Sequence, residues 1–145
     1  MKMSTNSRYG LRAMVDLIAF NKGTPVALSD IAERQQVSGS YLEHTFSMLR
    51  KADYVVSARG NQGGYIPSAG VEEKRVGDLL RILEGDLSMI DSGPAYTGPD
   101  LMKRCLRENV WDVVNLRVTQ AVDSIRLSDL AEEMRMRGSA LKQHT

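Results

Sequence analysis

Two short amphipathic segments joined by a tight polar turn constrain the fold of this chain more than any other feature. The first runs from Ser29, its expected N-cap, through Arg34. After Val37-Ser38-Gly39, Ser38 is placed to cap a second helix. Its apolar face is formed by Tyr41, Leu42, Thr45, Phe46 and Leu49. Two helices with so short a connection predict a helix-turn-helix.

A glycine-rich segment follows this pair directly. Residues 54–58 are β-branched and aromatic enough to form a strand, and Gly63-Gly64-Tyr65-Ile66 begins another. The connection between them starts with Arg59-Gly60, and its glycines let the backbone turn tightly. A hairpin in this position predicts the wing of a winged-helix domain, with an ordinary hairpin turn as the alternative. The glycine spacing fits neither the dinucleotide fingerprint nor the nucleotide-binding P-loop.

Helical patterns lie on both sides of this region. A helix is predicted over about residues 7–21, with Thr5 and Ser7 as possible N-caps, and another over residues 75–84, with Gly85 as its C-cap. Glycine and proline interrupt every period in residues 86–100, which predicts an irregular loop. The sequence therefore predicts a mainly α fold with a small β-hairpin.

The last third of the chain predicts one long helix, over residues 101–126. Its apolar stripe consists of Leu106, Val110, Val113, Val114, Leu116, Val118, Ala121, Val122 and Ile125. Ser128 is expected to cap a short final helix through Met134, and residues 138–145 should fray. We expect three parts: a winged helix-turn-helix domain at 1–85, a loop at 86–100, and a long helix with a C-terminal tail at 101–145.

The composition excludes several classes of protein. Of the 145 residues, 42% are hydrophobic and 26% are charged, which is ordinary globular composition. Residues 1–60 carry eight basic and five acidic side chains, and residues 61–100 carry three and seven. The single cysteine predicts a reducing compartment, with cytoplasm as the default. No signal peptide, membrane span or catalytic constellation is recognisable, so we expect neither a membrane protein nor an enzyme.

The polar face of the helix after Ser38 is the first candidate site. Ser40, Glu43 and His44 offer hydroxyl, carboxylate and imidazole groups that suit base edges in a DNA major groove. Arg50 and Lys51 at the end of this helix can meet phosphate. An arginine at the base of the wing, Arg59, can reach into a narrow minor groove. A plain solvated helix face is the alternative.

Several segments together resemble the Rrf-type (IscR/NsrR/CymR-like) family of winged helix-turn-helix transcriptional regulators. They are SRYGLRAM, SYLE, RGNQGGY, GDLLRILEG, CLRENVW and LSDLAEE, within roughly residues 1–130. The resemblance implies a homodimer that binds a palindromic operator in double-stranded DNA and acts as a repressor. It implies that the long helix packs against its partner, with Trp111 as an anchor of that packing or of the intramolecular core.

Residue by residue, the resemblance places Ser40, Glu43 and His44 at major-groove positions and Arg59 at the minor-groove wing position. His44 departs from the glutamine that IscR-like members carry. The full set expected to contact DNA is Arg8, Ser38, Ser40, Tyr41, Glu43, His44, Arg50, Lys51, Arg59 and Gly60.

The resemblance also raises the question of a cofactor. Many family members hold an iron–sulfur cluster in the loop at 86–100 with three cysteines, but this chain has only Cys105. Ser92 stands near the place of the first cysteine, either naturally or as an engineered replacement, and Glu108 stands where IscR-like members carry histidine. We therefore expect no cofactor and no metal.

Cys105 leaves one alternative function open. Lys103, Arg104 and Arg107 would favour its thiolate, so a redox or iron–sulfur sensing protein, built on the loop or on Cys105, is the alternative to a DNA-binding regulator. A small buried residue is the structural alternative for this thiol.

Overall fold

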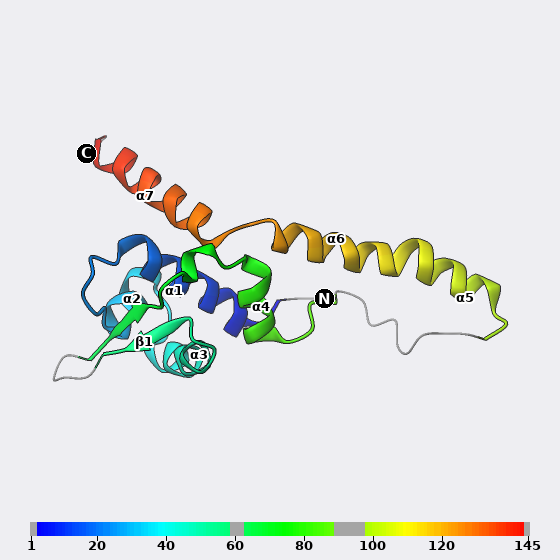
Figure 1. The fold of residues 1–145 in the computed structure, drawn as a ribbon, viewed down its shortest axis with the longest axis horizontal. Helices are drawn as coiled ribbons and strands as arrows, with labels where there is room; N and C mark the ends of the chain where they lie inside the picture. Colours follow the sequence, from blue (N-terminus) through cyan, green and yellow to red (C-terminus); the bar gives the residue numbers. More distant parts are fainter. Residues whose placement is uncertain (1–2, 59–62, 89–97, 144–145) are drawn as a thin grey trace.

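The computed structural model describes residues 3–58, 63–88 and 98–143, and it confirms a mainly helical fold with one antiparallel hairpin (Figure 1). The elements in chain order are α1 (Thr5–Phe20), α2 (Leu28–Gln35), α3 (Gly39–Lys51), β1 (Val55–Ser57), β2 (Tyr65–Pro67), the 3-10 turn η1 (Val71–Glu73), α4 (Val76–Glu84), α5 (Leu101–Leu106), the π-helical segment η2 (Arg107–Trp111), α6 (Asp112–Asp123) and α7 (Leu127–Gln143). Among the described residues, no helix is long and apolar enough to cross a membrane.

The helix α1 is the centre of the core. Every residue from Ala13 to Ala19 is buried, because α2, α3, α4 and α7 pack around this helix. The helix begins after Ser4, whose hydroxyl accepts from the Ser7 amide, so neither Thr5 nor Ser7 is the N-cap. Ser4 also bonds through its amide and hydroxyl to Glu84 on α4, and this tertiary contact fixes where the helix starts.

The helix-turn-helix is formed by α2 and α3. Ser29 is not the N-cap of α2: the cap is Ala27, because Val26 is held in a β-bridge to Tyr65 and the chain passes from that bridge straight into the helix. The turn begins at Gln36, which adopts a left-handed backbone conformation, and Ser38 is the N-cap of α3 as expected. Of the predicted apolar face of α3, Leu42, Thr45, Phe46 and Leu49 are buried, while Tyr41 remains 38% exposed.

The hairpin of β1 and β2 pairs Val55 with Pro67 and Ser57 with Tyr65. Ala58 donates its amide to the carbonyl of Gly64 at 2.9 Å, which closes the base of the hairpin. Gly64 has a φ of +110°, and a Cβ there would lie 2.8 Å from the carbonyl oxygen of Val26. Glycine is needed here both for the backbone conformation and for this close approach.

A long helical run, α5–η2–α6, extends away from the rest of the molecule (Figure 1). We call residues 101–123 the rod. The predicted long helix is found, but it ends at Asp123 rather than at 126, and it includes the π-helical segment η2. Its apolar residues are largely exposed in the single chain, including Leu101, Met102, Leu106, Trp111, Val113, Val114 and Leu116.

The rod is joined to α4 at its C-terminal end. Arg81 forms a bidentate ion pair with Asp123, both distances being 2.8 Å. The Asp123 carboxylate lies directly over Gly77, where a Cβ would overlap its Oδ1. Backbone hydrogen bonds from Val76 to Ile125 and from Leu127 to Lys74 continue the joint.

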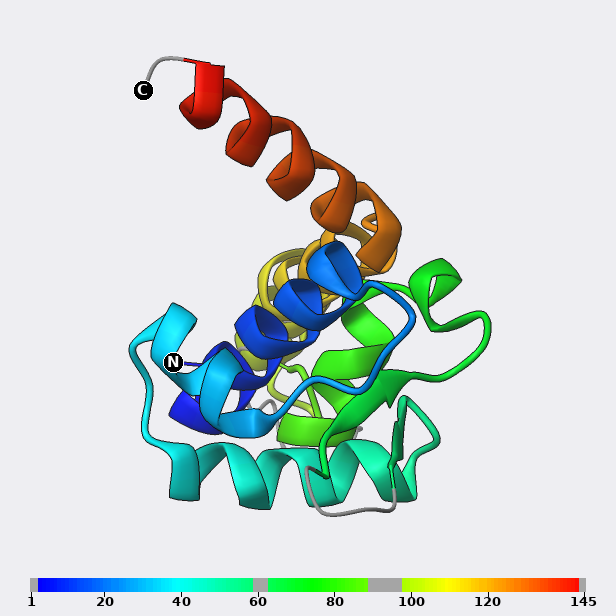
Figure 2. The same cartoon turned by 90° about the vertical axis from the view of Figure 1, so that its left-hand side faces the viewer.

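The final helix α7 turns back over α1. It has 17 residues, so the expectation of a short helix that frays from residue 138 is wrong, and Ser128 lies inside its first turn. Leu127 and Ala131 are fully buried in the same core as α1. Arg135 donates to the carbonyls of Ile18 and Ala19, each at 2.8 Å, and so caps the end of α1. Figure 2 shows α7 and α3 on opposite sides of α1.

Candidate nucleic-acid interface

The outward face of α3 carries most of the predicted contact residues. Ser40, Glu43 and His44 are exposed there, and Arg50 and Lys51 are exposed at the C-terminal end of the same helix. The helix runs along one side of the molecule with its buried face on α1 (Figure 2). One rigid element thus presents acceptors and donors for base edges together with cations for phosphate.

Two other predicted residues shape the beginning of α3. Ser38 Oγ lies 2.9 Å from Ser40 Oγ, so these two hydroxyls share a hydrogen bond. The Tyr41 ring packs edge-on against Tyr9 of α1, with 5.7 Å between the ring centroids. This packing fixes the ring and leaves part of it exposed next to Ser40.

The remaining predicted residues are Arg8, Arg59 and Gly60. Arg8 is exposed on α1. Arg59 and Gly60 lie outside the described residues. The base of their hairpin is fixed relative to α3, since the Tyr65 ring of β2 packs on Phe46 at 5.1 Å between centroids.

An ion pair that the sequence analysis did not identify holds α2 against α1. Asp16 is buried in α1, and Arg34 of α2 donates to both its oxygens at 3.1 and 2.7 Å. Gln35, the last residue of α2, donates to the same carboxylate at 2.7 Å. The hydrogen bonds that Arg34 donates to Asp16 raise the pKa of Arg34 above its usual value. The carboxylate thus sets the position of the first helix of the helix-turn-helix.

A second polar cluster ties the start of α1 to α4. Glu84 accepts hydrogen bonds from the hydroxyls of Ser4 and Ser7, and these bonds lower its pKa below the usual value. Asn6 of α1 accepts from Thr45 of α3 and donates to Leu83 at 3.5 Å. The first cluster thus fixes α1 against α2, and the second fixes it against α4 and, through Asn6, against α3, the helix that carries the candidate interface.

A helix-turn-helix whose second helix presents a polar outer face, beside a β-hairpin, defines the winged helix-turn-helix class of DNA-binding proteins. The chain belongs to the Rrf2 family: the model of this family, described as an iron-dependent transcriptional regulator, matches residues 3–133. The chain is therefore a DNA-binding transcriptional regulator and not an enzyme, as the sequence predicted.

Individual relatives agree with this placement. The chain is 34% identical over 135 residues to the HTH-type transcriptional regulator IscR of Vibrio atlanticus, covering 92% of this chain and 76% of the relative. Its fold is similar to that of CymR, the global cysteine regulator of B. subtilis, with a TM-score of 0.75, 34% identity, and 92% and 98% of the two chains covered. T. potens IscR gives a TM-score of 0.73 at 37% identity, with 92% and 88% covered.

The residues of this chain do not fit an iron–sulfur cluster of the thiolate-bound kind. Such clusters need several soft thiolate ligands, and the 145 residues contain one cysteine. Cys105 is exposed on α5, with Asn109 as its nearest hydrogen-bond donor at 3.7 Å, so it is not a buried packing residue in the single chain. Within residues 3–58, 63–88 and 98–143, no three His, Cys, Asp or Glu side chains are grouped for a metal ion. Ser92 lies outside these ranges.

Proposed function

We propose that this regulator binds a palindromic operator as a homodimer and acts as a repressor in the cytoplasm. The observation that carries the proposal is the exposed apolar surface of the rod. Leu101 is 75% exposed and Leu116 is 54% exposed, and Ser40, Glu43 and His44 on the α3 face that would read DNA are exposed as well. A long apolar helix of this kind is stabilised by covering it with a second copy.

Dimerisation would determine what DNA the protein recognises. A two-fold dimer places two α3 helices at a fixed spacing, so each would enter the major groove of one half-site. We propose that Ser40, Glu43 and His44 read base edges, and that Arg8, Arg50 and Lys51 contact phosphate. Arg59 with Gly60 would approach the minor groove from the wing. Ser38 and Tyr41 would form the edge of this surface at the start of α3. Trp111, 38% exposed on the rod, would pack in the dimer.

The three parts expected from the sequence enter this proposal with one addition. Residues 1–85 supply the DNA-binding surface and residues 101–145 supply the dimer contact, with the loop at 86–100 between them. In the structure, however, α7 packs on α1, so the last helix serves the first part as well. No cofactor is part of the proposed mechanism, which uses only the side chains of this chain.

Selection of binding sites from random double-stranded DNA tests the proposal. We expect an enriched palindrome with two half-sites about one helical turn apart, and an affinity that falls steeply with salt because phosphate contacts release counterions. Replacing His44 by Gln should change the preferred base at one position of each half-site, by about 1–3 kcal/mol. Arg59→Ala should weaken binding to the selected site.

Lys22→Ala is the matched control, since it removes one exposed cation from the segment between α1 and α2, outside the residues assigned to DNA or to the dimer. Its affinity should equal that of the wild type. A selected sequence without two-fold symmetry, or a monomer in light scattering at micromolar concentration, would overturn the homodimer. A transcriptional reporter behind the selected operator that is unchanged or less active when the protein is removed would overturn the repressor.

A further inference from the structure

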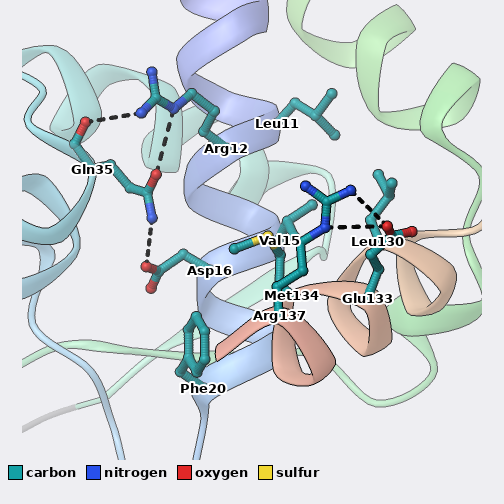
Figure 3. A pocket seen from close by; sticks show the side chains of 10 residues that line it. All are labelled: Leu11, Arg12, Val15, Asp16, Phe20, Gln35, Leu130, Glu133, Met134 and Arg137. Carbon is teal, nitrogen blue, oxygen red and sulfur yellow. Dashed lines mark hydrogen bonds and ion pairs between the residues drawn. The ribbon is translucent and has the colours of Figure 1, made fainter. Parts of the chain in front are cut away.

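A cavity of about 420 Å³ lies between α1, the end of α2 and α7 (Figure 3). Its volume falls in the range of small-molecule pockets, about 300–1,000 Å³. Half of its lining is apolar and comes from two helices, α1 and α7. These residues are Leu11, Val15, Phe20, Leu130 and Met134. One wall of the cavity is α7, which lies on the opposite side of α1 from α3 (Figure 2).

The charged residues that line the cavity are two arginines and two carboxylates. Both carboxylates are already paired: Asp16 with Arg34, which does not line the cavity, and Glu133 with Arg137 at 2.7 Å. Arg12 has no such partner, since no carboxylate of the described residues lies within 4 Å of its guanidinium. Arg12 is therefore the one charged group of the lining that is not in an ion pair.

Arg12 instead bonds to neutral oxygens at the end of α2. Its Nη2 donates to the carbonyl of Gln35 at 3.2 Å, and its Nε donates to the Gln35 side chain at 3.4 Å. The same Gln35 side chain donates to Asp16 at 2.7 Å, as Figure 3 shows. A guanidinium forms shorter and stronger hydrogen bonds with a carboxylate than with such neutral oxygens.

We propose that this cavity binds a small organic carboxylate with an aliphatic or aromatic body, and that the bound molecule changes DNA binding. The carboxylate would pair with Arg12, and the body would cover Val15, Phe20 and Met134. This chemistry matches the cavity, because half of its lining residues are apolar and the one charge outside an ion pair is positive.

The regulatory part rests on the proposed function and follows from the position of Gln35. This residue ends α2 immediately before the turn of the helix-turn-helix. A carboxylate that engages Arg12 competes with Gln35 for its N–H groups, and so loosens one of the bonds that hold the end of α2 in place. The expected result is a shift in operator affinity when the cavity is filled.

The binding part is tested on the full chain without DNA. The protein is labelled at its methionine methyl groups and titrated with 4-phenylbutyrate in NMR, with Met134→Leu used to assign the Met134 signal. We expect a saturable shift of the Met134 methyl and no shift of Met102, which is exposed on α5 and reports non-specific binding. A Met134 methyl signal of the folded protein that does not shift on titration would overturn the proposal. A signal that shifts only with protein concentration would also overturn it, because a second copy of the chain would then occupy the cavity.

Two comparisons separate the charge from the apolar contact. Arg12→Gln should weaken 4-phenylbutyrate binding about tenfold, the loss expected for one charge-assisted contact. The control Lys22→Gln, which removes an exposed cation that does not line the cavity, should leave binding unchanged. The neutral analogue 4-phenylbutanol should also bind about tenfold more weakly to the wild type. Equal affinity of the acid and the alcohol, or of Arg12→Gln and the wild type, would show that Arg12 does not select a carboxylate.

The regulatory part is then tested by measuring operator affinity with and without saturating 4-phenylbutyrate. We expect a change of at least severalfold in the wild type and a much smaller one in Leu11→Trp, whose larger side chain occupies part of the cavity. Unchanged operator affinity with a filled cavity would overturn the regulation alone. If no operator can be selected, the proposed function fails, while the methyl titration still decides whether the cavity binds a carboxylate.

Discussion

Of the glycines with described surroundings, Gly77 on α4 is the one where an added Cβ would come closest to another atom. Replacing it by alanine puts a methyl group onto Oδ1 of Asp123 and 3.0 Å from Nη1 of Arg81, well inside the 3.4 Å at which ordinary contact begins. The carboxylate cannot withdraw without breaking its two hydrogen bonds to Arg81, which join the rod to α4. The substitution therefore forces the joint apart.

Two effects of opposite sign decide the net change. Alanine stabilises a helix interior relative to glycine by about 1 kcal/mol. Overpacking a close contact costs about 1–3 kcal/mol, and a contact that also breaks a bidentate pair belongs at the upper end. We expect Gly77→Ala to lower the free energy of unfolding by about 1–2 kcal/mol.

Gly138 on α7 provides a matched control. Nothing lies within 4 Å of a Cβ at this position, so Gly138→Ala should stabilise the protein by about 0.5–1 kcal/mol. Urea unfolding measures both variants at a fixed protein concentration. In an Asp123→Ala background, Gly77→Ala should no longer destabilise the protein, because the clashing carboxylate is gone. If Gly77→Ala is as stable as Gly138→Ala, this result would contradict the close contact between Gly77 on α4 and Asp123 on α6.

Two further perturbations test the clusters around α1. Leu127→Ala should destabilise the protein by about 2–5 kcal/mol in urea unfolding, since Leu127 is fully buried, whereas Val56→Ala, at 51% exposure on β1, should cost much less; equal effects would show that α7 does not contribute to the core. Ser7→Ala should reduce stability at pH 7 but much less at pH 3. The pKa of Glu84 is lower in the folded protein than in the unfolded chain. The hydrogen bond therefore stabilises the fold at pH values above the unfolded-state pKa, and this stabilisation is lost as the pH falls through the folded-state pKa. A loss of stability in Ser7→Ala that does not depend on pH would contradict the role of this hydrogen bond.

The local fold around α3 could be predicted because its pattern is short-ranged. Leu42, Phe46 and Leu49 recur at helical spacing, and the hairpin glycines follow this helix closely in the sequence. Periodicity of this kind depends only on which residues must be buried, so it gives both the helix and its exposed face. The outward position of His44 follows from the same period.

The contacts that position this face could not be predicted in the same way. Asp16 interrupts the apolar sequence of α1, and a carboxylate there must have a partner. The sequence does not show which arginine it is, because Arg34 is 18 residues away on another helix. Glu84 is similar: its bonds to Ser4 and Ser7 span some 80 residues and decide where α1 begins.

The length of α7 was missed for a related reason. Gly138 and the polar residues after it predict fraying when the helix is considered alone. The structure anchors the helix through Arg135 on the end of α1, and through Leu127 and Ala131 in the core. These contacts lie more than 100 residues apart along the chain, beyond the reach of any local pattern.

The return of α7 to α1 has a consequence for how the protein is made. A chain grows from its N-terminus, so the helix-turn-helix leaves the ribosome long before Leu127 and Ala131 can fill its core. The rod lies between these parts, so every chain that completes its core already carries the rod. An unfinished or truncated product would lack the buried surface of α7. We therefore expect that it would not accumulate as a stable monomer that competes with the full chain for DNA sites.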